Sequence, residues 1–251
     1  MKISVIGSGN AATVLAKLCV QKGHFIQYIV ARHLEAAEEL SAQVGGKTCL
    51  IAEYVPAETD LIIVALSDNS LPDAIAGIDF KEIPVVHTAG AVSMQVLQNI
   101  AVNYGVLYPL QSLRKEMEII PPIPFLVEAN NLRTLHFVEY FAASLSDNVK
   151  AEREEKRIRL HIAAVIVNNF ANYLYTVAEE FCLNEKLDFD LLKPLISETA
   201  ERIMYRSPGF LQTGPASRKD MATLEKHTLL LSGYPEIHSL YKFMTDAIIK
   251  K

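Results

Sequence analysis

Short apolar runs alternate with amphipathic segments through the first half of the chain. Residues 2–6 form a β-branched run typical of a buried parallel strand, and after it the apolar spacing changes to the helical period. The same contrast predicts further strands at 24–31, 59–69, 85–90 and 105–109, separated by helices at 32–42, 71–76 and 93–102. Strand and helix in alternation predict a doubly wound parallel sheet, whose ligand lies beyond the carboxyl ends of the strands.

The pattern changes in the second half. A strand at 125–128 and a helix at 132–145 are expected to form the far edge of the same sheet. Strand signals then stop, and helices are predicted at 156–183, 190–205, 219–231 and 235–250. The predicted fold class is therefore α/β, with a Rossmann-type sheet domain in residues 1–151 and an all-α domain in residues 152–251. The charged run at 152–157 between them is expected to be a solvated helix start rather than a binding patch.

The turn after the first strand carries the pattern Gly-x-Gly-x-x-Ala between a strand and a helix, the context that a dinucleotide-binding turn requires. Gly7 would make the tight turn, Gly9 would let the backbone approach a diphosphate, and Ala12 would let the helix pack closely. The diphosphate would then sit at the positive end of the helix. The predicted cofactor-binding residues of this turn are Gly7, Ser8, Gly9, Asn10 and Ala11.

Arg32 follows the second strand, where sites that prefer NAD usually place an acid for the ribose 2′-hydroxyl. A guanidinium in that place suits a 2′-phosphate, because it can form two hydrogen bonds to phosphate oxygens. The sequence therefore favours NADP over NAD. Alternatively, Arg32 is only a solvated residue at a strand end.

Polar residues also follow the next strands of the predicted sheet. Parallel strands bring their carboxyl ends to one edge, so these residues are expected to surround the cofactor. The predicted set is Ser67, Asp68, His87, Thr88 and Pro109.

Three polar residues interrupt the apolar helix predicted at 156–183. At about 100° per residue, Asn168 and Asn172 lie about 20° to either side of His161, so the three would form one stripe. His161 could donate or accept a proton near neutral pH, and the asparagines could orient a carbonyl, imine or carboxylate. Alternatively, these are core groups that satisfy loop carbonyls or a neighbouring helix.

A second candidate segment runs from Gln212 to Asp220 and contains Gly-Pro. Ser217 or Asp220 can cap the helix that follows, and capping explains both residues. It does not explain Arg218, which could bind an acidic substrate group or a cofactor phosphate.

Composition narrows the choice of function. A net charge of -5 gives no basic surface for nucleic acid or an anionic membrane. Three widely spaced cysteines indicate a reducing, cytoplasmic environment, and no metal-binding motif is present. The apolar stretch 162–182 contains asparagines and glutamates, so it is expected to be a helix of a soluble protein rather than a membrane span. Walker A, Gly-x-Ser-x-Gly and Tyr-x-x-x-Lys motifs are absent.

Several motifs together carry a resemblance to a bacterial family. They are the glycine turn, Ser67-Asp68, the segments at 87–90 and 108–112, His161 with Asn168-Asn169, and residues 212–220. In these the chain resembles, over nearly its whole length, Rossmann-like proteins with a C-terminal domain of unknown function, DUF2520, described as NADP oxidoreductases. More distantly it is similar to the 6-phosphogluconate dehydrogenase superfamily. The resemblance implies a homodimer that pairs through its helical domains.

One position departs from the superfamily. β-Hydroxyacid dehydrogenases carry a catalytic Lys three residues before an Asn-Asn pair, and the matching residue here is Val165. Either His161 has taken the proton-transfer role or the protein does other chemistry. The first hypothesis is an NADP-dependent oxidoreductase acting on a small polar substrate, with His161, Asn168, Asn172 and Arg218 as catalytic or positioning residues. The second is a noncatalytic NADP(H) sensor that signals through a partner.

Overall fold

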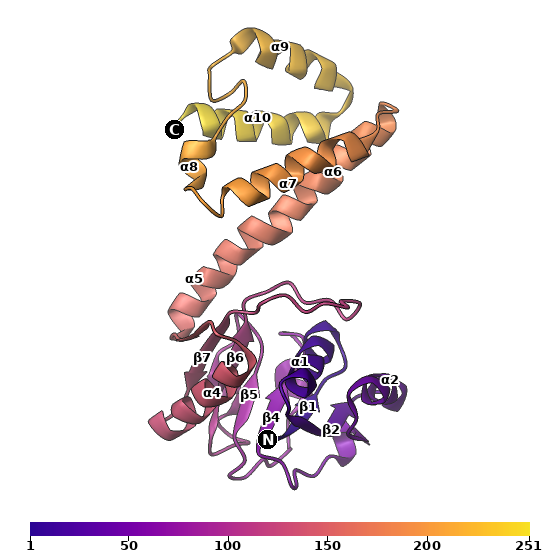
Figure 1. Cartoon of the computed structure of the whole chain (residues 1–251), viewed down its shortest axis with the longest axis vertical. Helices are drawn as coiled ribbons and strands as arrows, with labels where there is room; N and C mark the ends of the chain where they lie inside the picture. The colour runs from indigo at the N-terminus through magenta and orange to yellow at the C-terminus, as the bar shows by residue number, and fades with distance from the viewer. The chain divides into compact units, whose positions relative to one another are not determined.

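The computed structural model describes all 251 residues, which form two compact units: Met1–Asn169, the sheet unit, and Phe170–Lys251, the helical unit (Figure 1). The sheet unit contains one eight-stranded sheet in the order β3-β2-β1-β4-β5-β6-β7-β8. Neighbouring strands are parallel except β6 and β7, which are antiparallel. The strands are β1 (Lys2–Ile6), β2 (Phe25–Ala31), β3 (Lys47–Leu50), β4 (Leu61–Val64), β5 (Val85–His87), β6 (Tyr104–Pro109), β7 (Phe125–Ala129) and β8 (Val149–Ala151).

Apolar side chains of the strands point alternately to the two faces of the sheet, as the period of two requires. Leu61 and Ile63 of β4 pack in a core with helices α1 (Asn10–Gln21), α2 (Leu34–Val44) and α4 (Leu132–Leu145). Ile62 and Val64 pack in a second core with α3 (Leu71–Ala74) and the loops of the opposite face. The predicted α/β class with a doubly wound, Rossmann-type sheet is confirmed.

Some local predictions are wrong. The helix expected at 93–102 is only a 3-10 turn, Met94–Leu97, and the pattern did not predict the two short edge strands β3 and β8. Strands this short carry too few alternating positions to stand out from loops. Strand β7 and helix α4 lie where the sequence predicts them.

A long helical segment follows β8. It consists of α5 (Glu154–Ala164), a π-helical turn at Val165–Phe170, and α6 (Ala171–Asn184). Its first part belongs to the sheet unit, whose boundary follows Asn169. The functional division at 151/152 stays a prediction.

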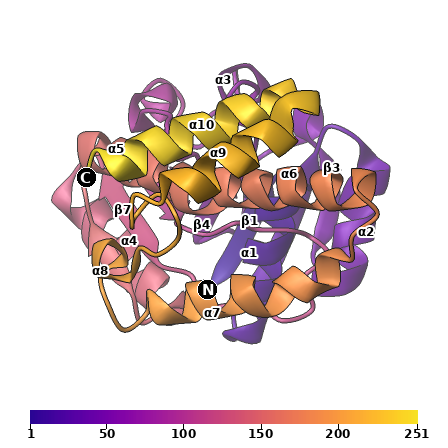
Figure 2. The same cartoon turned by 90° about the horizontal axis from the view of Figure 1, so that it is seen from above.

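The helical unit also contains α7 (Lys193–Arg202), α8 (Pro208–Leu211), α9 (Met221–Leu230) and α10 (Pro235–Ile249). Helices α9 and α10 lie side by side, with a 2.7 Å hydrogen bond between His227 Nδ1 and Tyr241 Oη (Figure 2). No helix in the protein combines the length and apolar character that a bilayer crossing requires.

Candidate functional site

The glycine turn connects β1 to α1 in a conformation that only glycine adopts easily. Gly7 has φ +129°, and a Cβ there would collide with the carbonyl oxygen of Ala65. Its N–H donates to the carbonyl oxygen of Val30 at 2.7 Å, which ties the turn to β2. The first glycine is therefore required by the fold itself.

Gly9 differs, because a Cβ at this position would meet no protein atom within 4 Å. It is the N-cap of α1, and no side chain caps the amino end of that helix. Free N–H groups beside open space fit a diphosphate. The turn faces a cavity of about 330 Å³ lined by Gly7, Ser8, Gly9, Val30, Ala31, Arg32, His33, Ile51, Ala65, Leu66, Ser67 and Ser70.

Arg32 lies at the end of β2 with an exposed side chain on the wall of this glycine-turn cavity. No carboxylate lines the same cavity. The arrangement fits a ligand with phosphate both at the helix end and at Arg32.

The remaining cofactor-site predictions are placed differently. The Asn10 side chain accepts from Lys115 N–H at 3.1 Å, and neither Asn10 nor Ala11 lines the cavity. Asp68 is exposed just beyond Ser67. His87 and Thr88 are buried at the end of β5 and do not line the glycine-turn cavity.

His87 is a neutral core residue. Its side chain is fully buried, and its Nδ1 accepts from Ala89 N–H at 3.2 Å. Burial, assisted by the positive charge of Arg157, lowers the pKa of His87 to about 4. The ring therefore stays uncharged near neutral pH.

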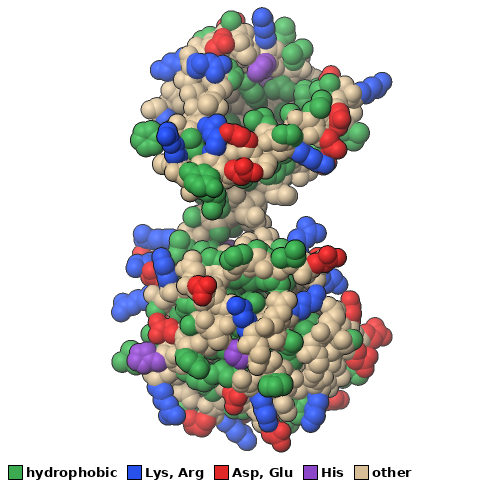
Figure 3. Space-filling model, in the orientation of Figure 1, with side chains coloured by type: hydrophobic (Ala, Val, Ile, Leu, Met, Phe, Trp, Pro, Cys, Tyr) green, Lys and Arg blue, Asp and Glu red, His purple; other side chains and the backbone are tan.

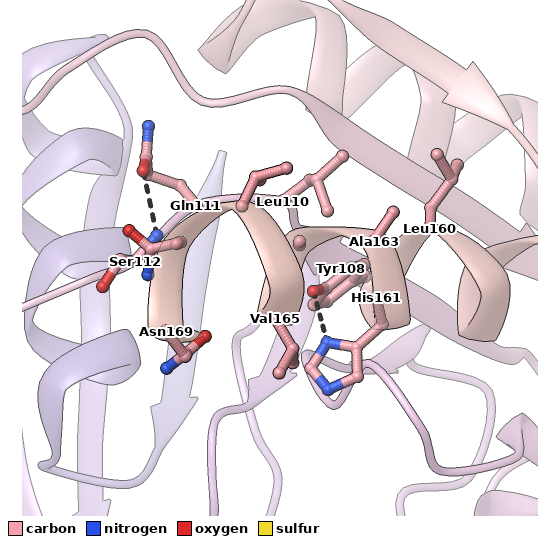
Figure 4. A pocket seen from close by; sticks show the side chains of 12 residues that line it. Tyr108, Leu110, Gln111, Ser112, Leu160, His161, Ala163, Val165 and Asn169 are labelled. Carbon is pink, nitrogen blue, oxygen red and sulfur yellow. Dashed lines mark hydrogen bonds between the residues drawn. The ribbon is translucent and has the colours of Figure 1, made fainter. Parts of the chain in front are cut away.

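A second and larger cavity, of about 650 Å³, lies where α5 crosses the end of β6 (Figure 4). It is mainly apolar, with a few hydrogen-bonding groups, and we call it the Tyr108 cavity. Its lining consists of Tyr108, Leu110, Gln111, Ser112, Leu160, His161, Ala163, Ala164, Val165, Val167, Asn168 and Asn169. The sequence-predicted residues His161 and Asn168 are thus brought together in one wall.

Tyr108 and His161 point toward each other in this cavity (Figure 4). The phenol oxygen lies 2.8 Å from His161 Nδ1, and the rings meet edge to face with centroids 5.8 Å apart. Burial and the negative charge of Asp68 raise the pKa of Tyr108. Both rings pack on Gly90, where a Cβ would lie 2.9 Å from His161 Nδ1 and from the Tyr108 ring.

Arg157, one turn before His161 on α5, is the one residue of the charged run that is buried, whereas its neighbours lie at a solvated helix start as predicted. Its side chain is fully buried and forms an ion pair with Glu128 of β7. It also donates to the carbonyl oxygens of Gly90 at 3.2 Å and Val92 at 2.6 Å. Arg157 therefore fixes the loop against which the Tyr108–His161 pair packs.

The predicted stripe of three polar residues assumed an unbroken α-helix, and that assumption is wrong. The π-helical turn at Val165–Phe170 lies between His161 and Asn172, so α-helical angles do not carry across it. Its β-branched start, Val165 to Val167, disfavours regular α-helix. Asn172 belongs to the helical unit and is exposed.

Arg218 is also an exposed residue of the helical unit. Asp220 beside it caps α9, accepting from Thr223 N–H at 3.2 Å, as the capping interpretation expects. Hydrogen bonds from Thr223 lower the pKa of Asp220.

Sequence reasoning missed two residues of this region. Tyr108 ends a predicted strand beside the predicted rim residue Pro109, so its position was a usable signal. Arg157 carried none, because a buried arginine inside a charged run looks like its solvated neighbours.

Two family models match the chain. The model of a domain of unknown function, DUF2520, matches residues 123–248, which is half of the chain. A model described as NADP oxidoreductase, coenzyme F420-dependent, matches residues 2–90. No curated protein matches the sequence.

Solved structures resemble the chain over its whole length. A Bacteroides fragilis protein provisionally named an NADP oxidoreductase is 35% identical, with a TM-score of 0.91, covering 100% of this chain and 98% of its own. Pyrroline-5-carboxylate reductase of Streptococcus pyogenes is 14% identical, with a TM-score of 0.64 and coverage of 100% and 99%. An imine reductase of Myxococcus stipitatus in complex with NADP+ is 15% identical, with a TM-score of 0.57 and coverage of 100% and 92%. At these identities the last two show a shared fold.

Proposed function

This chain belongs to the DUF2520 family and is similar to NADP oxidoreductases, and on that premise we propose that it transfers hydride between NADP(H) and a small polar substrate. The substrate would be a keto or hydroxy acid or an imine. The observation that carries the proposal is the open glycine turn with Arg32 beside it, in the same unit as the Tyr108 cavity. Strands β1, β4, β5 and β6 run parallel to one another, so the glycine turn and Ser67 follow strand ends on the side of the sheet where Tyr108 lies near the carboxyl end of β6.

The residues of the glycine turn would hold the diphosphate. The amino end of α1 supplies N–H groups, and Gly9 leaves room for the phosphates. Ser8, between Gly7 and Gly9, lines the same cavity. Arg32 would bind the 2′-phosphate. We keep Asn10, Ala11, Ser67, Asp68, His87 and Thr88 as proposed contributors near the cofactor. When bound, the cofactor supplies the hydride, and the protein supplies orientation and a proton.

Proton transfer is assigned to His161, whose ring lines the Tyr108 cavity. Asn168 would orient the reacting group from the same wall, and Asn172 and Arg218 would contribute from the helical unit. Val165 also lines the cavity and has no group that could transfer a proton. This division gives residues 1–151 the cofactor and residues 152–251 the substrate and dimer contacts.

The cofactor assignment is tested by comparing NADPH with NADH, which differ only in the 2′-phosphate. We expect Arg32→Ala to weaken NADPH binding about 10- to 100-fold, because a phosphate contact worth ~1.5–3 kcal/mol is lost. NADH binding should stay unchanged. Equal weakening of both cofactors, measured by fluorescence titration, would contradict the 2′-phosphate role.

Turnover is tested with NADPH and a panel of keto acids, imines and aldehydes, following the absorbance of the reduced cofactor. The proposal expects oxidation of NADPH with at least one of them and its loss in His161→Ala. Binding of NADPH without turnover, retained in His161→Ala, would instead support the alternative of a noncatalytic NADP(H) sensor.

We further propose a cytoplasmic homodimer that pairs through the helical unit and binds neither nucleic acid nor membranes. Exposed apolar side chains of the helical unit, including Leu191 and Phe210, support the pairing, and the net charge of -5 argues against a nucleic-acid partner. The three cysteines are free, and burial raises the pKa of Cys19 to about 12, which fits an unreactive thiol in a reducing compartment. Sedimentation equilibrium measures the dimer directly.

A further inference from the structure

The Tyr108 cavity contains only two side chains that can exchange a proton. Of the lining residues, ten are apolar, amide or hydroxyl groups without acid–base function near neutrality, and the others are Tyr108 and His161. No Asp, Glu, Lys or Arg lines the cavity. A substrate atom that needs a proton in this cavity must therefore receive it from this pair or from water.

The hydrogen bond between the two rings has a preferred direction. The Tyr108 hydroxyl has no protein acceptor other than His161 Nδ1, at 2.8 Å, and His161 Nε2 has no protein partner. If the phenol donates to Nδ1, both atoms are satisfied, and the imidazole hydrogen sits on Nε2. Nε2 has no protein partner in either direction, so the opposite direction differs in leaving the phenol hydrogen without an acceptor, which is the poorer arrangement.

We propose, resting on the proposed function, that Tyr108 and His161 form a proton relay in which Tyr108 is the proton source and His161 Nε2 is the donor to a substrate carbonyl oxygen. As the carbonyl carbon receives a hydride, the C=O π pair moves to oxygen, which bonds to the Nε2 hydrogen. The electron pair of the broken Nε2–H bond stays on the imidazole ring, and Nδ1 accepts the proton of Tyr108. To close the cycle, His161 Nε2 takes a proton from water and Nδ1 returns its proton to the Tyr108 phenolate. His161 ends neutral, and the only net input besides the hydride is one solvent proton.

Proton transfer from a phenol is thermodynamically favourable when the product is an alcohol. An alkoxide is about as basic as hydroxide, whose conjugate acid has a pKa of ~15.7, whereas the pKa of an ordinary tyrosine is ~10. Burial and Asp68 raise the pKa of Tyr108, and the Arg157 guanidinium opposes that rise. Tyr108 therefore keeps its proton at neutral pH, and an ordinary phenol is a much stronger acid than an alcohol.

Gly90 fits the same interpretation, because its bare Cα lets the two rings meet. A Cβ there would lie within 3.0 Å of both rings, and Arg157 holds the Gly90 carbonyl oxygen. The φ of Gly90 is not positive, so an alanine would bring a steric conflict with the pair and no backbone strain. Gly90→Ala therefore disturbs the pair without deleting either ring.

The first test reads the tautomer without any substrate. In protein with 15N-labelled histidine at alkaline pH, we expect His161 Nδ1 to be unprotonated and Nε2 to carry the hydrogen. Tyr108→Phe and Gly90→Ala should shift His161 toward a mixture of tautomers. Tyr104→Phe is the matched control, because its phenol on the same strand donates to Gln95 Oε1 at 3.1 Å, outside the cavity. A hydrogen on Nδ1 in the unaltered protein would overturn the relay.

The second test uses turnover. With a carbonyl substrate found in the panel, Tyr108→Phe should lower kcat by ~10²-fold, in the usual range for a lost proton transfer, and leave NADPH affinity unchanged. Rates in mixtures of H2O and D2O should curve in the unaltered protein, because two protons move, and become linear in Tyr108→Phe. Tyr104→Phe should behave like the unaltered protein.

The outcomes separate the two proposals. Absence of turnover in the unaltered protein with every carbonyl and imine would refute the oxidoreductase proposal, and the tautomer would still decide the direction of the hydrogen bond. Turnover that is equal in Tyr108→Phe, with a linear isotope dependence in both proteins, would refute the relay and leave the oxidoreductase proposal intact.

Discussion

The two units of the chain bury their apolar residues very differently. All three clusters of buried apolar residues lie within residues 1–149 of the sheet unit. In the helical unit the only buried apolar residues are Cys182, Ala216, Leu224 and Leu231. Leu183, Leu191, Phe210 and Phe243 are among its many exposed large side chains, and Figure 3 shows apolar groups across its surface.

The comparison indicates two sources of stability. The sheet unit holds its fold through its own core, whereas the 82 residues of the helical unit bury few apolar side chains to offset the entropy of folding. We therefore expect a second copy of the chain to cover the helical unit. We therefore expect equivalent substitutions in the two units to change stability by different amounts.

The largest effect is expected from removing the same side chain in each unit. Phe141 of α4 is fully buried, and Phe141→Ala should lower the free energy of unfolding by ~3–5 kcal/mol. Phe243 of α10 is 70% exposed, and Phe243→Ala should cost under ~0.5 kcal/mol in dilute protein. Urea denaturation measures both. Similar losses at low concentration would show that the helical unit has a core of its own.

A smaller effect, confined to the sheet unit, is expected from His87. In the unfolded chain a histidine takes up a proton below pH ~6.5, whereas burial holds the pKa of His87 at about 4 in the fold. Between these values the unfolded chain binds more protons, so stability falls as the pH falls from ~6.5 to ~4, by up to ~3 kcal/mol. Above this window the contribution is fully present, and below it no further loss occurs.

His87→Asn tests this dependence, because the asparagine oxygen can still accept from Ala89 N–H. The variant should show a shallower decline in Tm between those pH values. An unchanged slope would assign the acid sensitivity to other groups.

The next effect concerns the helical unit and protein concentration. If a second copy covers it, a tenfold dilution should lower the apparent stability of the dimer by ~1.4 kcal/mol. Leu191→Ser, at a side chain that is 77% exposed, should abolish that dependence by weakening the pairing. Exposed Leu132→Ser in the sheet unit is the control and should preserve it. A Tm that does not depend on protein concentration would contradict the proposal that a second copy covers the helical unit.

The smallest effect on stability is expected at Gly9, inside the stable unit. Because a Cβ there meets no protein atom, Gly9→Ala should change stability by less than ~0.5 kcal/mol. NADPH binding should nevertheless weaken at least tenfold, since the new methyl group occupies the place proposed for the diphosphate. An unaltered NADPH affinity, measured by titration, would contradict the proposal that the cofactor binds at this turn.

The sequence predicted the fold well where an apolar run or a periodic pattern indicated which residues are buried. Strands such as β1 and β4 and helix α4 carry that pattern over several residues, whereas β3 and the 94–97 turn carry too little of it. The glycine turn was readable because its conformation restricts residue type at Gly7. These constraints act between residues close in the chain, so they can be recognised in the sequence.

The candidate site was only partly readable because its contacts are not local. His161 was found as a polar residue in an apolar helix, but its partner Tyr108 lies 53 residues earlier and fits a strand equally well. Arg157 meets Glu128 and the loop after β5 only through the tertiary fold. The π-helical turn was missed because the β-branched residues at 165–167 disfavour α-helix without specifying a π-helical turn.

That turn also determines how this cavity could change in evolution. A π-helical turn holds one residue more than the α-helix around it, so loss of one residue within 165–167 would leave an ordinary helix. Such a deletion would change the direction in which Asn168 and Asn169 point relative to His161. Deletion of a single codon could thus change which side chains line the Tyr108 cavity while leaving His161 in place, which would be a short route from one ligand preference to another.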